Sequence, residues 1–498
     1  MNITNFKYVL PALGMTTALN AVANEHKNVQ STEQPNILFV LLDDLAYDAI
    51  ENSGRYPFLK TPNINKLQEK GTTLNNYFCT MSLSSPGRAC LLTGVYPHKH
   101  GVTQNHPRVD ADWATYNPVS SFLQKAGYET AHIGKIHMSL KANKDQIRPG
   151  YDYWLSFRGQ GEYYNNTLNE NGHEFKEPGY ITDVLTDYAK DWLTDKRKAK
   201  DKPFFLCLWH KAVHGPFTAA KRHKGCYQQE MLPEPPNGNG CETFEGKPEW
   251  QKRKKTHYKI GDNDPEWNPD FKEPKNILET LRAVDESLGE MMKTLKKLGK
   301  DKNTIIIFSS DNGYFMGEHG FWDKRISYDE CLRIPMIIYN PMAKNAPKEI
   351  DEMCINVDIM PTLLDYAGIK IPKYVQGMSL RPLLDGKKVE KWRHSFLFEY
   401  YVDDEYPYAG PTQLAVRTDR YKYVDALPFE EMDELYDLQK DPGEMHNLIN
   451  NPDYAIVVEA MKRELEKLKI ETEFTYDRDW WLRREIPKHK KKYPTLIR

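Results

Sequence analysis

Four short segments of the chain consist almost entirely of apolar residues and are bounded by polar ones. They cover residues 36–42, 203–209, 304–308 and 334–339. Runs of this length, rich in β-branched side chains, are typical of strands with both faces buried, because they lack the polar alternation of a half-exposed strand. The four segments therefore predict strands at the centre of a covered sheet.

Two segments between these runs have apolar residues at helical spacing. In the first, Ile181, Leu185 and Trp192 share one helix face. The second covers residues 284–298 and ends at Gly299, a residue type that often terminates helices. Strands that alternate with helices predict an α/β fold, with a large, mainly parallel central sheet sandwiched by helices.

The pattern changes near residue 385, where alternating strand-like segments with tight turns replace the long apolar runs. We expect strands over 395–400, 414–417 and 421–424, followed by a helix over 454–468. The interpretation divides the chain into a main catalytic α/β domain over 35–385 and a smaller C-terminal α+β subdomain over 386–498.

Two stretches fall outside this framework. Residues 1–23 place Lys7 before a short apolar run and end in a small-x-small pattern, which predicts a secretory signal peptide, with a disordered tail as the alternative. No later run reaches the roughly 18 apolar residues of a membrane span, so we expect no membrane-spanning segment. The signal peptide predicts export, with the periplasm as the expected location. Residues 218–275, polar and rich in Pro and Gly, predict a long loop over the active face.

Composition narrows the class of protein. The 498 residues include 68 Lys and Arg against 70 Asp and Glu, and this net charge of −2 argues against a nucleic-acid partner. The aromatic content of 12% suits stacking on sugars, although an aromatic core has the same composition. Seven cysteines without a CxxC motif exclude a simple disulfide framework or a zinc knuckle, while Cys226 and Cys241 could pair in an oxidising compartment.

Polar residues follow three of the predicted strands. Asp43 and Asp44 end the first run, Asp311 and Asn312 follow the third, and His214 lies just after the second. In open α/β sheets, ligands bind beyond the carboxyl ends of the strands. We therefore expect these side chains to meet at one site, although the sequence separates them widely.

The segment Ser84-Ser85-Pro86-Gly87-Arg88, followed by an apolar pair and Thr93-Gly94, resembles the signature of the type I sulfatases. That signature reads Cys or Ser, any residue, Pro, any residue, Arg, and the family belongs to the alkaline-phosphatase-like superfamily. The resemblance implies that a maturase converts Ser84 to formylglycine. Gly87 departs from the Ser, Thr or Ala usual at its position.

Other stretches resemble further family elements in the same order. They are Gly134-Lys135-Ile136-His137, with Ile136 in place of Trp, then His214-Gly215-Pro216-Phe217, then residues 317–324 ending in Lys324, and finally residues 434–448. The resemblance covers most of the chain after residue 35. It implies a bacterial sulfatase that hydrolyses a sulfate ester on a sulfated polysaccharide or oligosaccharide.

The resemblance also implies a metal site. Its ligands would be Asp43, Asp44, Asp311, Asn312 and the modified residue at Ser84. An all-oxygen ligand set favours a hard cation over zinc, so we expect Ca²⁺, with Mg²⁺ as the alternative.

Roles for the remaining residues follow from the same resemblance. Lys135 and Lys324 would bind the sulfate, since preorganised cations stabilise the charge of its oxygens in the transition state. Arg88 would steady residue 84. His214 is the expected general acid and His137 the expected base, and the reverse assignment stays open.

The residues that would recognise the neighbouring sugar are less defined. Arg158, His100 and His319 are the candidates for substrate binding. Tyr163 and Tyr164 could contact sugar or pack in the core.

Two alternatives remain open from the sequence. An unmodified Ser84 could attack phosphorus, as in phosphatases and phosphonate hydrolases of the superfamily, although those relatives generally need a two-zinc site rich in His and Asp. A chain whose Ser84 is never converted would be a non-catalytic protein that binds sulfated glycans.

Overall fold

The computed structural model describes residues 34–105, 110–138, 147–238, 241–252, 272–401, 410–426 and 432–475. The described residues from Pro35 onward form one compact unit. The predicted signal peptide lies outside the described residues, as do residues 253–271 of the predicted long loop. Among the helices that the structure describes, none combines the length and apolar character needed to cross a membrane.

Ten strands of the described residues form the main sheet. In order across the sheet they are β13 (Glu349–Ile350), β2 (Thr72–Leu74), β12 (Met336–Tyr339), β9 (Thr304–Ser310), β1 (Asn36–Leu42), β8 (Phe204–Trp209), β4 (Glu129–Lys135), β5 (Tyr153–Phe157), β6 (Thr167–Glu170) and β7 (His173–Lys176). The five strands from β9 to β5 run parallel, whereas β12, β6 and β7 are antiparallel to their neighbours in this order. The prediction of a mainly parallel central sheet is therefore confirmed.

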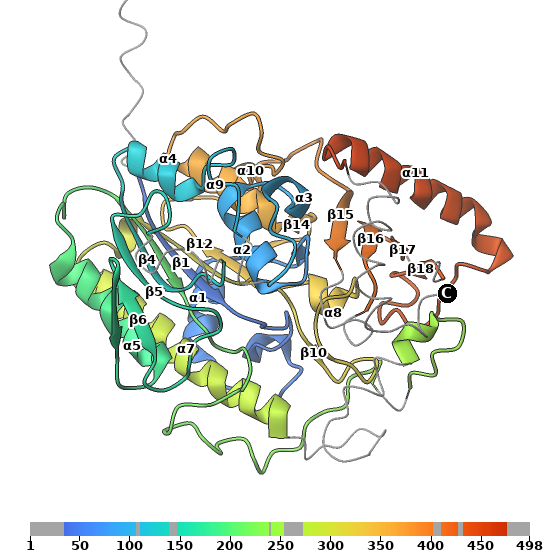
Figure 1. Ribbon diagram of the computed structural model, residues 1–498, viewed down its shortest axis with the longest axis horizontal. Helices are drawn as coiled ribbons and strands as arrows, with labels where there is room; N and C mark the ends of the chain where they lie inside the picture. Colours follow the sequence, from blue (N-terminus) through green and yellow to red (C-terminus); the bar gives the residue numbers. More distant parts are fainter. Residues whose placement is uncertain are drawn as a thin grey trace, which may run out of the picture. The chain divides into compact units, whose positions relative to one another are not determined.

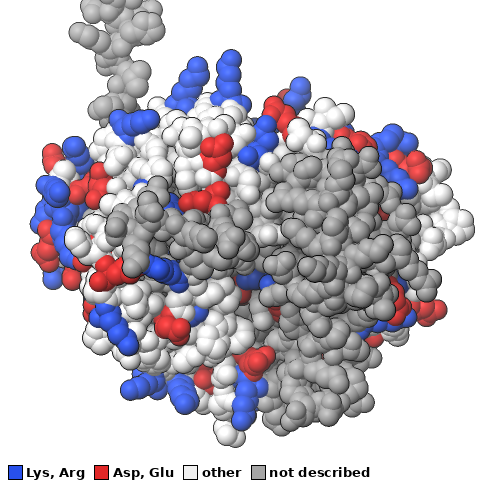
Figure 2. Space-filling view, viewed as in Figure 1, with Lys and Arg blue, Asp and Glu red and all other residues white. Residues whose placement is uncertain are grey.

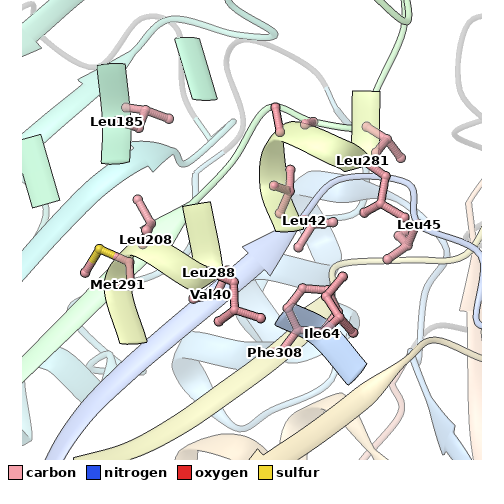
Figure 3. Packing of buried hydrophobic residues seen from close by; sticks show 14 of the residues in the cluster. Val40, Leu42, Leu45, Ile64, Leu185, Leu208, Leu281, Leu288, Met291 and Phe308 are labelled. Carbon is pink, nitrogen blue, oxygen red and sulfur yellow. The ribbon is translucent and has the colours of Figure 1, made fainter. Parts of the chain in front are cut away.

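Helices cover both faces of this sheet (Figure 1). On one face lie α1 (Pro62–Lys70), α5 (Ile181–Asp191) and α7 (Lys272–Lys297), and on the other α2 (Ser84–Thr93), α4 (Val119–Lys125), α9 (Ile359–Tyr366) and α10 (Arg381–Leu384). Alternate residues of each strand point to opposite faces. Figure 3 shows Val40 and Leu208 beside Leu288 and Met291 of α7, and Phe308 beside Ile64 of α1, on the first face.

The helix predicted over 284–298 is longer than expected, because α7 begins at Lys272. The predicted loop over 218–275 was therefore wrong at its end. Pro274 made this stretch resemble a loop, but proline is tolerated in the first turn of a helix, where its missing N–H has no partner to lose.

The C-terminal part contains a four-stranded antiparallel sheet formed by β15 (Ser395–Tyr400), β16 (Gln413–Thr418), β17 (Tyr421–Asp425) and β18 (Glu434–Asp437). The helix α11 (Ala455–Glu471) packs on it through Val458, Met461 and Leu465. The expected α+β architecture is confirmed, although β18 was not predicted. The domain boundary at residue 385 stays a prediction.

This C-terminal sheet contacts the segment that leads into α2. The Phe78 and Phe396 rings stack with their centroids 5.2 Å apart, and the Glu399 N–H donates to the Thr80 carbonyl at 3.0 Å. The short strand β3 (Tyr77–Phe78) and the start of α2 at Ser84 flank this contact. The C-terminal part therefore supports the position of Ser84.

The distribution of surface charges agrees with the composition, whereas the state of two cysteines differs from the expectation. Figure 2 shows side chains of both signs interspersed over the part of that face that is not grey, as the net charge of −2 suggests. Cys226 and Cys241 are both exposed free thiols, so the proposed pairing between them was wrong.

Candidate active site

The carboxyl ends of β1, β9 and β8 lie together at one edge of the sheet, as predicted. β1 and β9 pair in parallel with Leu42 opposite Ser310, so Asp43 and Asp44 leave the sheet beside Asp311. The Asp44 N–H donates to Asp311 Oδ1 at 3.3 Å. At the end of β8, the Ala212 carbonyl accepts a 3.0 Å hydrogen bond from the Asp43 N–H.

Ser84 is the first residue of α2 and is fully buried. Its hydroxyl donates to Asp43 Oδ1 at 2.9 Å and accepts from Lys324 Nζ at 3.3 Å. The N-terminal end of a helix carries partial positive charge, so this position suits a group that becomes negative during reaction. The position of Ser84 is therefore compatible with the nucleophile that the sequence predicts there.

The structure explains why residue 87 is a glycine. A Cβ atom at this position would lie 2.4 Å from the Asp311 carbonyl oxygen, closer than non-bonded atoms approach. Glycine therefore allows α2 to pack directly against the end of β9, and the departure from the usual signature follows from that close approach.

Arg88 joins the strand ends from one turn further along α2. Its Nε donates to Asp311 Oδ2 at 2.8 Å, one Nη to the Lys135 carbonyl at 2.7 Å and the other to Asp43 Oδ2 at 3.3 Å. The side chain is fully buried. The two contacts with carboxylates make Arg88 an internal counter-charge of the site.

Two lysines face the carboxylates. Lys135 pairs with Asp43 and also contacts the Gln160 amide oxygen, while Lys324 pairs with Asp44. Burial lowers the pKa of Lys135 to about 8, although Asp43 opposes the shift. Burial also opposes the charge of Lys324, but the carboxylates of Asp44 and Asp43 raise its pKa above the ordinary value.

The pKa values of the three carboxylates at the site shift in different directions. Although burial disfavours its ionisation, Lys135 and other neighbouring cations hold the pKa of Asp43 well below its usual range. Burial and the charge of Asp43 raise the pKa of Asp311 to about 6. Burial raises the pKa of Asp44, which Lys324 only partly offsets. A further cation at these carboxylates would relieve their mutual repulsion.

Both predicted histidines lie at this site. His214 Nε2 is 3.6 Å from Asp44 Oδ2, and its Nδ1 is 2.9 Å from the Gly215 carbonyl oxygen. His137 has a left-handed backbone with φ of 62°, and its carbonyl accepts a 2.7 Å hydrogen bond from the Ser85 hydroxyl. Burial and the charge of Lys135 lower the pKa of both imidazoles well below the ordinary value.

The donors present fit a divalent cation. Ligand atoms of Asp43, Asp44 and His214 lie within 4.8 Å of one another, which makes these three a possible metal site. Asn312 Nδ2 donates to Asp44 Oδ1 at 2.7 Å, while its Oδ1 is buried and has no hydrogen-bond partner among the described residues. An orphaned amide oxygen beside carboxylates is the kind of group that a metal ion would satisfy.

The hydrogen bonds of the three predicted substrate-binding residues go to partners other than Ser84 and the carboxylates around it. Arg158 is exposed after β5, and its Nε donates to Glu174 Oε1 at 2.8 Å. His100 is buried, with Nε2 3.3 Å from Cys90 Sγ and Nδ1 accepting from the Val102 N–H. These contacts favour a structural role for His100, and substrate binding by Arg158 stays a prediction.

His319 is also enclosed by protein. Its Nδ1 lies 2.7 Å from Glu242 Oε2, and its Nε2 lies 3.2 Å from Asn237 Nδ2. Its ring packs 4.4 Å from that of Tyr328. Both ring nitrogens are therefore engaged inside the protein, and a substrate contact of His319 stays a prediction without support from these contacts.

Two residues at the site were missed. Gln160 contacts Lys135 from the loop after β5, and Lys211 lies two residues after β8, near His214. Glycines on both sides of Gln160, directly after a strand, were a signal that could have indicated it. Tyr163, left open between sugar contact and packing, is buried, and its hydroxyl donates to the His214 carbonyl at 2.7 Å.

Two family models match the chain. The model described as Sulfatase matches residues 35–369, and the model described as N-sulphoglucosamine sulphohydrolase, C-terminal, matches residues 317–471. The chain belongs to the sulfatase family. As a sulfatase it is a sulfuric ester hydrolase, which confirms the predicted enzyme class.

Named relatives of this sulfatase extend the comparison. An N-acetylglucosamine-6-O-sulfatase of Bacteroides thetaiotaomicron is 31% identical over 94% of this chain and 90% of its own length. The N-acetylglucosamine-6-sulfatase of Homo sapiens is 31% identical over 74% of this chain and 68% of its own.

Solved structures agree with the fold of this sulfatase. One, described as a complex with its substrate D-glucosamine-2-N,6-O-disulfate, superposes with a TM-score of 0.80 at 29% identity, covering 90% of this chain and 99% of that one. The phosphonate monoester hydrolase of Agrobacterium radiobacter has a TM-score of 0.70 at 21% identity, covering 88% and 96%. The second likeness is one of fold alone.

Proposed function

We propose that this sulfatase hydrolyses a sulfate ester on a sulfated carbohydrate, with Ser84 converted to formylglycine and one Ca²⁺ ion at the carboxylates. The observation that carries the proposal is the position of Ser84 Oγ, 2.9 Å from Asp43 Oδ1 and 3.3 Å from Lys324 Nζ. The hydroxyl of residue 84 thus lies between a carboxylate for the metal and a cation for the sulfate.

The carbohydrate part of the proposal is supported by the relatives. Two of them are named as 6-sulfatases of N-acetylglucosamine, and a similar structure is described with a 6-O-sulfated glucosamine as its substrate. We therefore propose the 6-O-sulfate of a glucosamine unit as the ester that this chain hydrolyses.

The metal would be held by Asp43, Asp44, Asp311, Asn312 and residue 84. We favour this all-oxygen set over one that includes His214, because Asn312 Oδ1 is buried without a partner among the described residues. Oxygen ligands suit Ca²⁺, with Mg²⁺ as the alternative. When bound, the cation supplies Lewis-acid stabilisation of negative charge at residue 84, and formylglycine supplies a nucleophilic hydroxyl.

Side chains of the protein would bind the sulfate, orient residue 84 and transfer protons. Lys135 and Lys324 bind the sulfate oxygens, since both are buried cations that already face the site. Arg88 holds α2 against the strand ends and so orients residue 84. His214 donates a proton to the leaving alcohol oxygen, and His137 accepts a proton from residue 84.

Burial of Ser84 bears on the timing of its conversion. The side chain is fully buried at the start of α2. A maturase could not reach it in the folded chain, so conversion would precede folding. This order fits a protein exported through the signal peptide proposed at residues 1–23, with activity in the periplasm.

Hydrolysis of phosphate or phosphonate esters is the second candidate, because phosphonate monoester hydrolases share the fold. It predicts turnover of phenyl phosphonates and, for an unmodified Ser84, two zinc ions per chain. A single calcium ion together with sulfate release would reject it.

The proposal is tested with protein coexpressed with a formylglycine-generating enzyme. Mass spectrometry of the peptide that contains residue 84 should show the loss of two hydrogens, and sulfate release should be fastest on 6-O-sulfated glucosamine among a panel of sulfated sugars. Converted protein that released no sulfate from any sugar, while hydrolysing small aryl sulfates, would overturn the carbohydrate assignment.

A further inference from the structure

Lys211 is a buried lysine beside the site that the proposed mechanism does not use. It follows β8 by two residues and is 1% exposed. Its ammonium donates to the Gly215 carbonyl at 3.0 Å and lies 4.9 Å from the centre of the Tyr163 ring. No carboxylate of the described residues forms an ion pair with it. Burying a cation without a direct counter-ion costs free energy, so we expect Lys211 to have a function at this position.

The Gly215 carbonyl oxygen that Lys211 contacts is also the partner of His214. His214 Nδ1 lies 2.9 Å from the same oxygen. A carbonyl oxygen only accepts hydrogen bonds, so Nδ1 must carry a hydrogen in this arrangement. The other ring nitrogen, Nε2, is therefore the one that exchanges a proton at the site, where it lies 3.6 Å from Asp44 Oδ2.

The backbone around His214 is held by further contacts. Tyr163 OH donates to the His214 carbonyl at 2.7 Å, and the His214 N–H donates to the Lys211 carbonyl at 3.1 Å. The Lys211 ammonium lies over the ring of the same Tyr163. Lys211 and Tyr163 thus anchor two successive carbonyls, those of His214 and Gly215.

We propose that Lys211 is a positioning residue for His214. By holding the Gly215 carbonyl, it fixes the imidazole so that Nε2 faces the leaving oxygen of the substrate. Without its ammonium, this carbonyl would keep only the imidazole as a donor, and both groups could turn. The inference rests on the proposed role of His214 as the acid that protonates the leaving alcohol.

The leaving group provides the test. A sugar alcohol is a poor leaving group that needs protonation, whereas the phenolate of 4-nitrocatechol sulfate leaves without it. Lys211→Met should lower kcat on 6-O-sulfated glucosamine by about 10- to 100-fold, part of the full contribution of a general acid, and on 4-nitrocatechol sulfate by less than about threefold. KM should change little. All rates are divided by the fraction of formylglycine measured in each preparation.

A double-mutant cycle separates this inference from the proposed function. If Lys211 acts through His214, Lys211→Met should cause no further loss in a His214→Gln background, and additive losses would overturn the inference. If His214→Gln itself slows both substrates equally, the acid assignment fails. If His214→Gln affects only the sugar sulfate while Lys211→Met affects both substrates equally, the inference alone fails.

The chain offers a matched control in Lys275. This lysine is 2% exposed, and its Nζ donates to the Gln228 carbonyl at 3.1 Å, away from His214. Lys275→Met should lower the thermal midpoint but leave the ratio of the two kcat values unchanged. If Lys211→Met does not fold, Tyr163→Phe removes the neighbouring anchor and should shift this ratio in the same direction. An unchanged ratio in Tyr163→Phe would then overturn the inference.

A crystal structure of the Lys211→Met variant adds a readout that is independent of activity. The His214 ring should be rotated away from the Gly215 carbonyl. An unmoved ring together with an unchanged ratio of kcat values would contradict the positioning role.

Discussion

The Ser84 hydroxyl donates a 2.9 Å hydrogen bond to Oδ1 of Asp43, although 41 residues separate the two in sequence. The contact exists because β1 ends at Leu42 and α2 begins at Ser84, so the N-terminal end of the helix meets the carboxyl end of the strand. Lys324 approaches the same hydroxyl at 3.3 Å.

Replacing Ser84 by alanine should abolish turnover. With no oxygen on residue 84 there is no nucleophile and nothing to convert to formylglycine, so sulfate release should fall by at least about a thousandfold. The fold should remain, because Asp43 keeps its contacts with Arg88 and Lys135. Ser85→Ala is the matched control, since its hydroxyl contacts only the His137 carbonyl in the described structure, and it should retain activity within about tenfold. Substantial activity of Ser84→Ala would contradict the assignment.

Arg88 should contribute more to stability than any exposed arginine. Arg88→Met leaves the buried carboxylates of Asp43 and Asp311 without their guanidinium, which should lower the free energy of unfolding by about 3–5 kcal/mol. Urea denaturation measures the loss. In the control Arg222→Met, exposed ion pairs with Asp183 and Glu286 are removed, and the loss should stay below about 1 kcal/mol. Similar losses in both variants would show that the buried network does not stabilise the fold.

Removal of divalent cations should destabilise the protein and stop turnover. A ligand that binds only the folded state, at a hundred times its dissociation constant, stabilises by about 2.7 kcal/mol, so added Ca²⁺ should raise the thermal midpoint of chelator-treated protein. Asn312→Leu removes the orphaned amide oxygen and should weaken binding by at least about tenfold, the loss typical even of residues that only support a ligand.

The control for this prediction is Asn36→Leu. Asn36 is also buried, but it lies at the opposite end of β1, where its amide donates to the Asn303 carbonyl at 3.1 Å. Calorimetric titration should show unchanged Ca²⁺ affinity for this variant. Equal weakening in Asn36→Leu and Asn312→Leu would remove Asn312 from the proposed ligands.

The meeting of Asp43 with Asp311 could be predicted from the sequence, because each residue follows a strand directly. Parallel strands end at the same edge of a sheet, so the order of elements was enough. Strand direction could not be predicted in the same way. The run at 334–339 has the same apolar signal as the run at 36–42, yet β12 is antiparallel to β9.

The residues that sequence reasoning missed depend on long-range geometry. Gln160 reaches Lys135 because β5 lies beside β4 in the sheet, and no local pattern encodes that order. Lys211 looks like an ordinary polar residue after a strand until the Gly215 carbonyl is placed beside it. His100, in contrast, was predicted to bind substrate, but its ring nitrogens contact the Cys90 thiol and the Val102 N–H.

A buried histidine in the short helix α3 (Pro97–His100) should make stability depend on pH. His98 Nδ1 lies 2.6 Å from Glu399 Oε1, and Nε2 lies 2.8 Å from the Thr472 carbonyl oxygen. Both nitrogens face acceptors, so the doubly protonated ring satisfies both contacts. Burial opposes this charge, but Glu399 raises the pKa of His98 above the ordinary value of 6.5.

The sign of the effect follows from this raised pKa. Below the unfolded pKa of 6.5, the ring is charged in both states and its full stabilisation is present, whereas it is lost as the pH rises through the folded pKa. His98→Gln should therefore destabilise the protein more at about pH 5.5 than at about pH 9, as measured by urea denaturation. His394→Gln, which removes the contact of an exposed ring with Asp419, is the control for the loss of a histidine. Equal destabilisation by His98→Gln at both pH values would mean that the ring is neutral in the folded protein and joins the C-terminal part to α3 by uncharged contacts alone.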